Sequence, residues 1–176
     1  MRRFRFAVMV LVLASAKGLI VAQAAAQDDK GIFTSSSSGK FAALPGAPAC
    51  MTARVDKGDP SKGAAVIALK FTAGCKVPWH WHTSAENLFM VSGSGKAAMK
   101  DGGTAAMHAG SFAYLPAKHV HEFTCVAACM MYDTTETAFD LHYVDADGKE
   151  ISPEQALAKP KKAMAAAKSM KRADAK

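Results

Sequence analysis

The sequence predicts an all-β sandwich or barrel, and three observations support this fold class. Short apolar runs recur between turn signals from about residue 47 onward. The tripeptide Asp101-Gly102-Gly103, between two of these runs, is a strong signal for a β-hairpin. No long amphipathic helix interrupts the series, which argues against a parallel α/β sheet. The β-rich part of the chain has about a hundred residues, enough to bury one hydrophobic core, so we predict a single domain.

The apolar runs give nine strand candidates in chain order. They are residues 51–55, 64–72, 86–92, 94–100, 104–107, 111–115, 119–126, 129–134 and 138–144. After the last of them, Ser152-Pro153-Glu154-Gln155 has the pattern of a capping box with proline at the first helical position. This pattern predicts a short C-terminal helix, which Pro160 ends early.

The first 26 residues have the layout of a secretory signal peptide. Three arginines at positions 2, 3 and 5 precede an apolar run from residue 6 to 16, which is too short to span a bilayer. Small-residue cleavage sites follow, at Ala22-Gln23-Ala24 and Ala24-Ala25-Ala26, and Ala14-Ser15-Ala16 also qualifies. We therefore expect an exported protein, periplasmic or secreted, without stable membrane insertion after cleavage. An uncleaved membrane anchor is the alternative.

Composition divides the remaining chain into three parts. Residues 27–46 are polar and include a run of four serines, so we interpret them as a flexible lead-in. The predicted domain covers residues 47–150, and a basic tail covers residues 151–176. The net charge of +7 comprises +4 from the signal peptide and +6 from residues 159–176, so the rest sums to 7 − 4 − 6 = −3. A mildly acidic domain argues against nucleic acid as a partner.

Four cysteines, an even number in an exported chain, indicate disulfides. Cys125 and Cys129 bracket only three residues, so they can lie opposite each other across a hairpin. Cys50–Cys75 is the complementary pair. Three pairings are possible in all, and two free cysteines beside one bridge remain an alternative.

The most informative local pattern is His80-Trp81-His82, followed by Glu86 and, far along the chain, by His121. In a strand, residues i and i+2 share a face, so His80 and His82 point the same way while Trp81 turns aside. After a bend at Thr83-Ser84-Ala85, Glu86 can add a carboxylate from the next strand. Three imidazoles and one carboxylate suit Fe, Mn, Ni, Co, Zn or Cu, and the set does not choose among them.

The residues around these ligands resemble the two motifs of the cupin superfamily. Residues 74–93 fit the first motif, G-x5-H-x-H-x3-E-x6-G, at every fixed position. Residues 110–125 resemble the second motif, although Lys118 and Cys125 replace its usual glycine and asparagine. The resemblance covers about residues 47–145. It implies a single cupin jelly-roll domain in which His80, His82, Glu86 and His121 bind one divalent transition metal.

Period-2 alternation predicts the lining of a cavity around this metal. Leu88 and Met90 share the face of Glu86, and His119 and Phe123 share that of His121. These apolar side chains equally suit an ordinary core. His119 is our candidate for a catalytic acid–base group, with simple hydrogen bonding at the cavity mouth as the alternative.

The resemblance leaves the reaction open, because cupin sites serve dioxygenases, isomerases, decarboxylases and binding modules alike. Our leading hypothesis is a metal-dependent oxidoreductase of the dioxygenase kind that acts on a small organic molecule. The alternative is a non-catalytic module that uses the metal to bind or sense a small ligand. A metal store is a third hypothesis, and the resemblance also implies a possible homodimer.

Overall fold

The computed structural model of the chain describes residues 31–158. The predicted signal peptide at 1–26 and the basic residues of the tail from 159 onward lie outside the described residues. A first compact unit comprises residues 1–33, of which only Gly31–Phe33 are described, and these three residues form neither helix nor strand. All elements below belong to the second unit.

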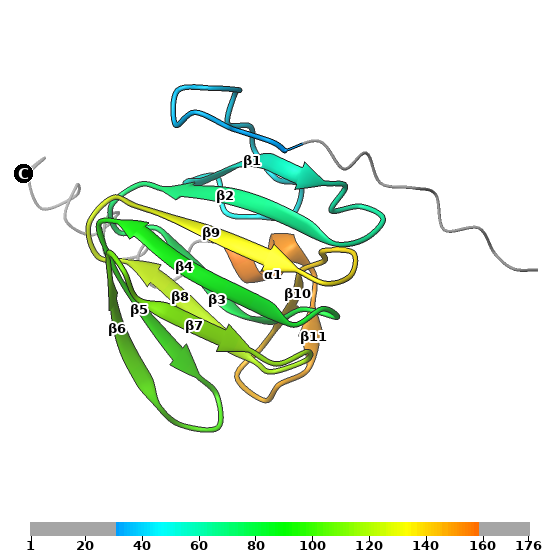
Figure 1. The fold of residues 1–176 in the computed structure, drawn as a ribbon. Coiled ribbons are helices and arrows are strands. Elements are labelled where there is room, and N and C mark those ends of the chain that lie inside the picture. Colours follow the sequence, from blue (N-terminus) through cyan, green and yellow to red (C-terminus); the bar gives the residue numbers. More distant parts are fainter. Residues whose placement is uncertain (1–30, 159–176) are drawn as a thin grey trace, which may run out of the picture. The chain divides into compact units, whose positions relative to one another are not determined.

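Two antiparallel sheets form the fold (Figure 1). The first sheet has the order β1 (Met51–Gly58), β2 (Ala65–Phe71), β9 (Cys129–Thr135), β4 (Glu86–Ser92) and β7 (Phe112–Leu115). The second has the order β11 (Glu150–Ile151), β10 (His142–Val144), β3 (Lys76–Trp81), β8 (His121–Cys125), β5 (Ser94–Met99) and β6 (Thr104–His108). A short helix, α1 (Pro153–Leu157), follows. The predicted all-β jelly roll with a helical C-terminal segment is therefore confirmed.

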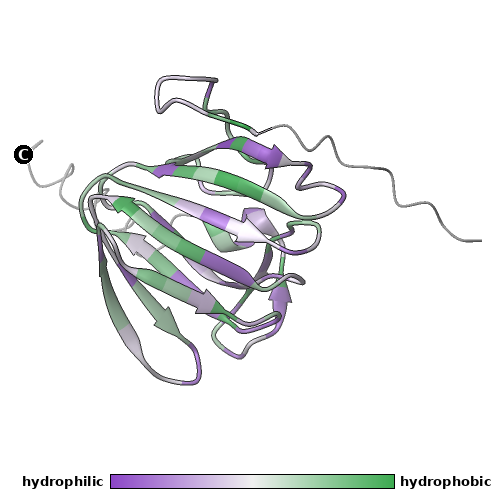
Figure 2. Ribbon diagram, in the orientation of Figure 1, coloured by the Kyte–Doolittle hydropathy of each residue, from purple (hydrophilic) through white to green (hydrophobic). Residues whose placement is uncertain are grey.

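The core lies between the two sheets, because alternate residues of each strand point inward. On β9, for example, Cys129, Met131, Asp133 and Thr135 are buried while the residues between them are half-buried. Ile67 of β2 and Phe123 of β8 belong to the same core from opposite sheets. Figure 2 shows apolar stretches along β2 and β4 and polar residues at many of the turns.

Several predicted strands have different bounds in the structure. The candidate at 138–144 is a strand only at His142–Val144, because residues 136–141 bind neighbouring loops instead. The candidate at 119–126 begins at His121 rather than His119. The two-residue strand β11 was not predicted. The capping box at Ser152 is confirmed, since Ser152 Oγ accepts from the Gln155 amide and Gln155 Oε1 accepts from the Ser152 amide.

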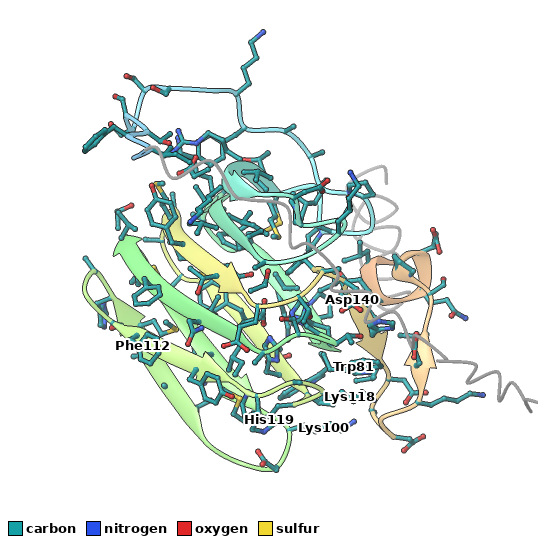
Figure 3. All side chains as sticks on the ribbon, turned by 45° about the vertical axis from the view of Figure 1, so that its right-hand side comes forward. Trp81, Lys100, Phe112, Lys118, His119 and Asp140 are labelled. Atoms are coloured by element: carbon teal, nitrogen blue, oxygen red, sulfur yellow. A yellow bond between two sulfur atoms is a disulfide. The ribbon has the colours of Figure 1, made fainter. Side chains whose placement is uncertain are left out.

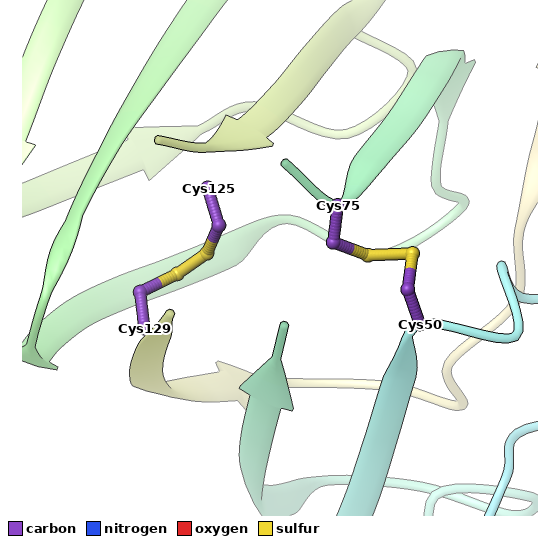
Figure 4. The surroundings of a disulfide bond; sticks show 4 residues. All are labelled: Cys50, Cys75, Cys125 and Cys129. Atoms are coloured by element: carbon purple, nitrogen blue, oxygen red, sulfur yellow. A yellow bond between two sulfur atoms is a disulfide. The ribbon is translucent and has the colours of Figure 1, made fainter. Parts of the chain in front are cut away.

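Two disulfides join the predicted pairs, Cys50–Cys75 and Cys125–Cys129 (Figure 4). Cys50 directly precedes β1 and Cys75 directly precedes β3. The first disulfide therefore connects the two sheets at the N-terminal ends of these strands. The second joins the end of β8 to the start of β9, across a short turn between the sheets. Among the described residues no cysteine is free.

The segment before β1 contacts the domain within the second unit. Ala42 pairs with Ala53 in an isolated antiparallel bridge, and Arg54 donates hydrogen bonds to Ser35 and Ser38 carbonyls. At the other end, Ile151, Ala156 and Leu157 pack against the core. Within residues 31–158, no helix has the length and apolar character needed to cross a membrane.

The backbone conformation of Lys118 explains why β8 begins at His121 and not, as predicted, at residue 119. Its φ is 62°, and it is the single non-glycine residue with positive φ in the described chain. The turn also closes through the His119 amide, which donates to the Pro116 carbonyl at 3.1 Å. This left-handed conformation is strained for a side chain with a Cβ atom.

Replacing Lys118 by glycine is expected to raise the free energy of unfolding by about 0.5–1 kcal/mol. Glycine adopts the left-handed region without strain, although its larger entropy in the unfolded chain offsets part of the gain. Urea denaturation measures the change. The matched control is Lys96→Gly on β5, an exposed strand position where glycine is expected to destabilise the protein. Equal destabilisation by both variants would contradict strain at Lys118.

Candidate metal centre

Strand pairing brings the four predicted metal ligands together. His80 on β3 and His121 on β8 are direct partners in the second sheet. His82 directly follows β3, and Glu86 begins β4 in the facing sheet. All four side chains are buried, with exposed fractions of 3% for His80 and 4% for each of the other three.

Their nitrogen and oxygen atoms converge on one point. One ring nitrogen from each histidine lies within 4.8 Å of those from the other two. Glu86 Oε2 lies 3.1 Å from His82 Nε2 and 3.5 Å from His121 Nε2. Ligand atoms that each lie about 2.1 Å from one ion, at right angles, are about 3 Å apart. The spacing around Glu86 therefore fits a shared metal ion.

Backbone carbonyls set the orientation of the three imidazole rings. His80 Nδ1 donates to the Pro78 carbonyl at 2.6 Å, and His121 Nδ1 donates to the His119 carbonyl at 2.8 Å. His82 Nδ1 donates to the Asp140 carbonyl. Because each Nδ1 carries the proton, each Nε2 keeps a lone pair, which is the form that binds metals.

Burial favours the neutral form of every group in the cluster. It lowers the pKa of His121, lowers that of His80 well below its usual value, and lowers that of His82 to about 3. Burial raises the pKa of Glu86 well above its usual value, and the charge of Asp133 adds to this effect. Three neutral imidazoles lie beside a buried carboxyl, and no Lys or Arg is among the described residues that line the site. A divalent cation bound there would favour the ionised form of Glu86.

The cluster lies at one end of an apolar cavity. The cavity has a volume of about 40 Å³. From the first sheet the lining includes Met51, Leu69, Phe71, Leu88, Leu115 and Met131. The second sheet adds Val77, Ala97 and Phe123, and the loop before β10 adds Phe139. Leu88 and Phe123 thus line the cavity as period-2 alternation predicted, whereas Met90 is buried without being part of the lining.

His119, the predicted acid–base group, does not join the cavity lining. It lies in the turn before β8, and its Nε2 is 3.2 Å from Asp101 Oδ2. The expectation that it shares the face of His121 was wrong, because the strand does not extend back to residue 119. Its backbone carbonyl contributes to the centre instead, by binding His121 Nδ1.

Asp140, which was not predicted as a site residue, makes hydrogen bonds with both His82 and the next residue, Thr83. Its carbonyl binds the His82 ring, and its Oδ1 accepts from the Thr83 amide at 2.7 Å. Its Oδ2 lies 3.2 Å from Nε2 of His142, and the His142 ring stacks on Trp81 with 3.9 Å between centroids. Figure 3 shows Trp81 and Asp140 on the same side of the molecule, far from Phe112. Asp140 therefore acts as a positioning residue for His82.

Replacing Asp140 by alanine is expected to lower the affinity for Zn²⁺ about tenfold, because the loop that orients His82 loses its side-chain anchors. Isothermal titration calorimetry measures the affinity. Asp140→Asn should retain most of it, since an amide oxygen still accepts from the Thr83 amide. Asp147→Ala, at an exposed turn position, is the control. Wild-type affinity in Asp140→Ala would show that the loop does not orient His82.

Asp133 is a second buried carboxyl next to the cluster. It lies on β9 opposite Leu88 of β4, is 0% exposed, and makes no ion pair among the described residues. Burial raises its pKa from 3.8 to about 6. The alternation of buried residues on β9 was the signal that could have located it, because Met131 and Asp133 share the inward face.

Replacing Asp133 by asparagine is expected to stabilise the metal-free protein by about 2 kcal/mol at pH 8. Between pH 3.8 and about 6 the folded state keeps a proton that the unfolded state has lost, so stability falls as pH rises through this window. Asparagine does not ionise, so the variant avoids this loss of stability. The cost of burying the amide group offsets part of the gain. Urea denaturation at pH 4 and pH 8 tests it. A variant less stable than wild type at both pH values would contradict the prediction, and Asp147→Asn should change neither.

Comparison with known proteins agrees with this geometry. Residues 69–134 match the model of the Cupin domain family. The range contains His80, His82, Glu86 and His121. No curated protein sequence matches the chain.

Several solved structures share the fold at low identity. A protein from Methylibium petroleiphilum PM1, named as a suggested acetylacetone dioxygenase, is 17% identical with a TM-score of 0.57; the match covers 76% of this chain and 98% of that one. The polyketide cyclase RemF from Streptomyces resistomycificus is also 17% identical with a TM-score of 0.57, covering 66% and 87%. An RmlC-like cupin from Shewanella frigidimarina NCIMB 400 is 16% identical with a TM-score of 0.53, covering 62% and 93%.

The motif residues, the two antiparallel sheets and the domain match lead to one conclusion: the described part of this protein contains one cupin domain.

Proposed function

We propose that this protein is an exported, metal-dependent cupin that acts on a small organic molecule as an oxidoreductase of the dioxygenase kind. The observation that carries the proposal is the convergence of one ring nitrogen from each of three histidines, and of Glu86, at one end of an apolar cavity. The similarity in fold to the Methylibium petroleiphilum protein, with its suggested dioxygenase activity, supports the reaction type.

Each part of the centre has a defined role in this proposal. A bound transition metal would supply Lewis acidity and, if redox-active, electron exchange with O₂. His80, His82 and His121 present fixed lone pairs, and Glu86 adds a negative charge. The apolar lining keeps bulk water away, which strengthens electrostatic interactions at the metal end. Three or four protein ligands leave positions open for a substrate oxygen.

Oxygen consumption tests the proposed reaction. Protein loaded separately with Fe²⁺, Mn²⁺, Ni²⁺, Co²⁺ and Cu²⁺ is incubated with a panel of diketones and phenols, including 2,4-pentanedione, in an oxygen electrode. We expect O₂ uptake with at least one metal and substrate, and its loss in His121→Ala. Absence of uptake throughout the panel, with metal binding intact, would count against an oxidoreductase.

One observation favours the alternative, a module that binds or senses a small ligand. Among the described residues that line the cavity, no acid–base side chain is present besides the proposed ligands and Glu122. Glu122 pairs with Lys76 at 2.6 Å, and the inward neighbours on β8 are His121 and Phe123. Native mass spectrometry distinguishes the two functions, because a binding module retains a ligand that stays unchanged on incubation with O₂.

Export is part of the proposal. The signal-peptide pattern of residues 1–26 supports it, and so do two disulfides, which persist mainly in oxidising compartments. The mass of the native protein tests it. We expect an N-terminus created by cleavage near Ala24 or Ala26, whereas a chain that retains residue 1 in the reducing cytoplasm would contradict export.

The homodimer implied by the resemblance is also a proposal. Phe89 and Val91 of β4 and Phe112 and Tyr114 of β7 are exposed, with fractions between 45% and 57%, on the outer face near the sheet edge. Exposed apolar patches of this kind often mark contact surfaces. Sedimentation equilibrium should give twice the mass of one chain, and a single-chain mass at all concentrations would contradict a dimer.

A further inference from the structure

The cavity has two chemically different ends. The polar atoms gather at the end formed by His80, His82, His121 and Glu86. Apart from Glu122, which pairs with Lys76, the rest of the lining is apolar: Phe71 and Phe123 pack with 5.6 Å between ring centroids, and Phe139 lies 5.0 Å from the His82 ring. Among the described lining residues none is Lys, Arg, Asn, Gln, Ser, Thr or Tyr.

This division limits what the body of a ligand can carry. A charged group or hydroxyl that leaves water for an apolar wall loses its hydrogen bonds and receives no replacement. Each unmatched group of this kind should lower affinity at least tenfold. Sugars and dicarboxylates, which carry polar groups along their length, are therefore poorly matched to this cavity.

The size of the cavity limits the ligand further. The cavity volume of about 40 Å³ suits a short chain or a small branched group. Phe139 lines the cavity beside His82 and comes from the irregular segment before β10. This segment is held by hydrogen bonds from the Phe139 amide to Pro60 and from the Glu136 and Thr137 amides to Ser84.

We propose that the ligand class consists of short molecules with one oxygen-bearing end, which binds at the metal, and an apolar body without charge or hydroxyl groups. This inference rests on the metal centre proposed above and adds the specificity that the cavity lining confers. Phe139, beside His82, is the residue that limits the bulk of the ligand next to its oxygen-bearing end.

A matched series of four-carbon acids tests the polarity requirement. Butyrate, succinate and threonate each have four carbons and a carboxylate at one end. Succinate adds a second carboxylate at the other end and threonate adds hydroxyl groups, so only butyrate is wholly apolar beyond its first carboxylate. Protein loaded with Co²⁺ is titrated with each acid, and the visible absorption of the metal reports binding. We expect butyrate to bind at least 30-fold more tightly than succinate or threonate.

The possible failures are distinguishable in the same experiment. If Co²⁺ binds and succinate or threonate binds as tightly as butyrate, the proposed ligand class is wrong while the metal centre stands. If Co²⁺ does not bind, both the metal centre and the ligand class are wrong.

The role of Phe139 has its own test. Phe139→Ala should raise the affinity for 2-methylbutyrate relative to butyrate about tenfold, because the smaller side chain leaves room for a branch beside the carboxylate. Phe139→Leu is a milder variant that should shift the ratio in the same direction. Phe112→Ala, on the exposed outer face, is the matched control and should leave the ratio unchanged. An unchanged ratio in both Phe139 variants, or an equal shift in Phe112→Ala, would overturn the assignment.

Discussion

Alanine in place of His82 is expected to lower the affinity for a divalent transition metal by about 100-fold or more. His82 supplies a ring nitrogen directly to the centre, 3.1 Å from Glu86 Oε2, whereas residues that only orient ligands change affinity by about 10- to 100-fold. The fold should survive, because the loss of one neutral imidazole leaves the two sheets and both disulfides in place. Isothermal titration calorimetry with Zn²⁺ and Co²⁺ measures the loss.

The control for this variant is His108→Ala. His108 ends β6 on an exposed position and is not part of the histidine cluster. We expect its affinity for both metals to equal that of wild type. Similar losses in the two variants would mean that the metal binds to histidines in general, and not at the buried centre.

Removal of the Cys50–Cys75 disulfide, by alanine at both positions, is expected to lower the free energy of unfolding by about 3 kcal/mol. The disulfide closes a loop with a sequence separation of 25, so its loss gives the unfolded chain considerable conformational freedom. Urea denaturation of the oxidised protein measures the effect.

The second disulfide provides a matched comparison. Cys125 and Cys129 are separated by only 4 positions, so their replacement by alanine should cost less, about 2 kcal/mol. Both pairs are largely buried, which keeps the packing change comparable. A larger loss for the Cys125–Cys129 pair would show that loop closure does not determine the contribution of these disulfides.

The sequence was sufficient to predict the fold class and to identify the four proposed ligands as one group. The apolar run between turn signals located the strand Glu86–Ser92 with its observed bounds, because its ends coincide with the bend before Glu86 and the glycine after Ser92. His80 and His82 are two residues apart, so one face of a single strand is enough to explain why both point the same way. The partnership of His80 with His121 is non-local, and only the motif resemblance indicated it.

Contacts distant along the chain explain what sequence alone did not reveal. Asp140 was assigned to a strand because its neighbours are apolar, yet its carbonyl and carboxylate bind the segment that carries His82. His119 was placed on the face of His121 because alternation was extended through a turn that Lys118 closes with positive φ. The position of Asp133 beside Glu86 depends on the order β9–β4 in the sheet, which local patterns do not specify.

Anomalous X-ray scattering from crystals of the mature protein grown with Co²⁺ tests the central claim most directly. The account predicts one strong peak about 2.0–2.2 Å from Nε2 of His80, His82 and His121 and from a carboxylate oxygen of Glu86. A peak bound by other residues, or none at this point in protein saturated with Co²⁺, would contradict it.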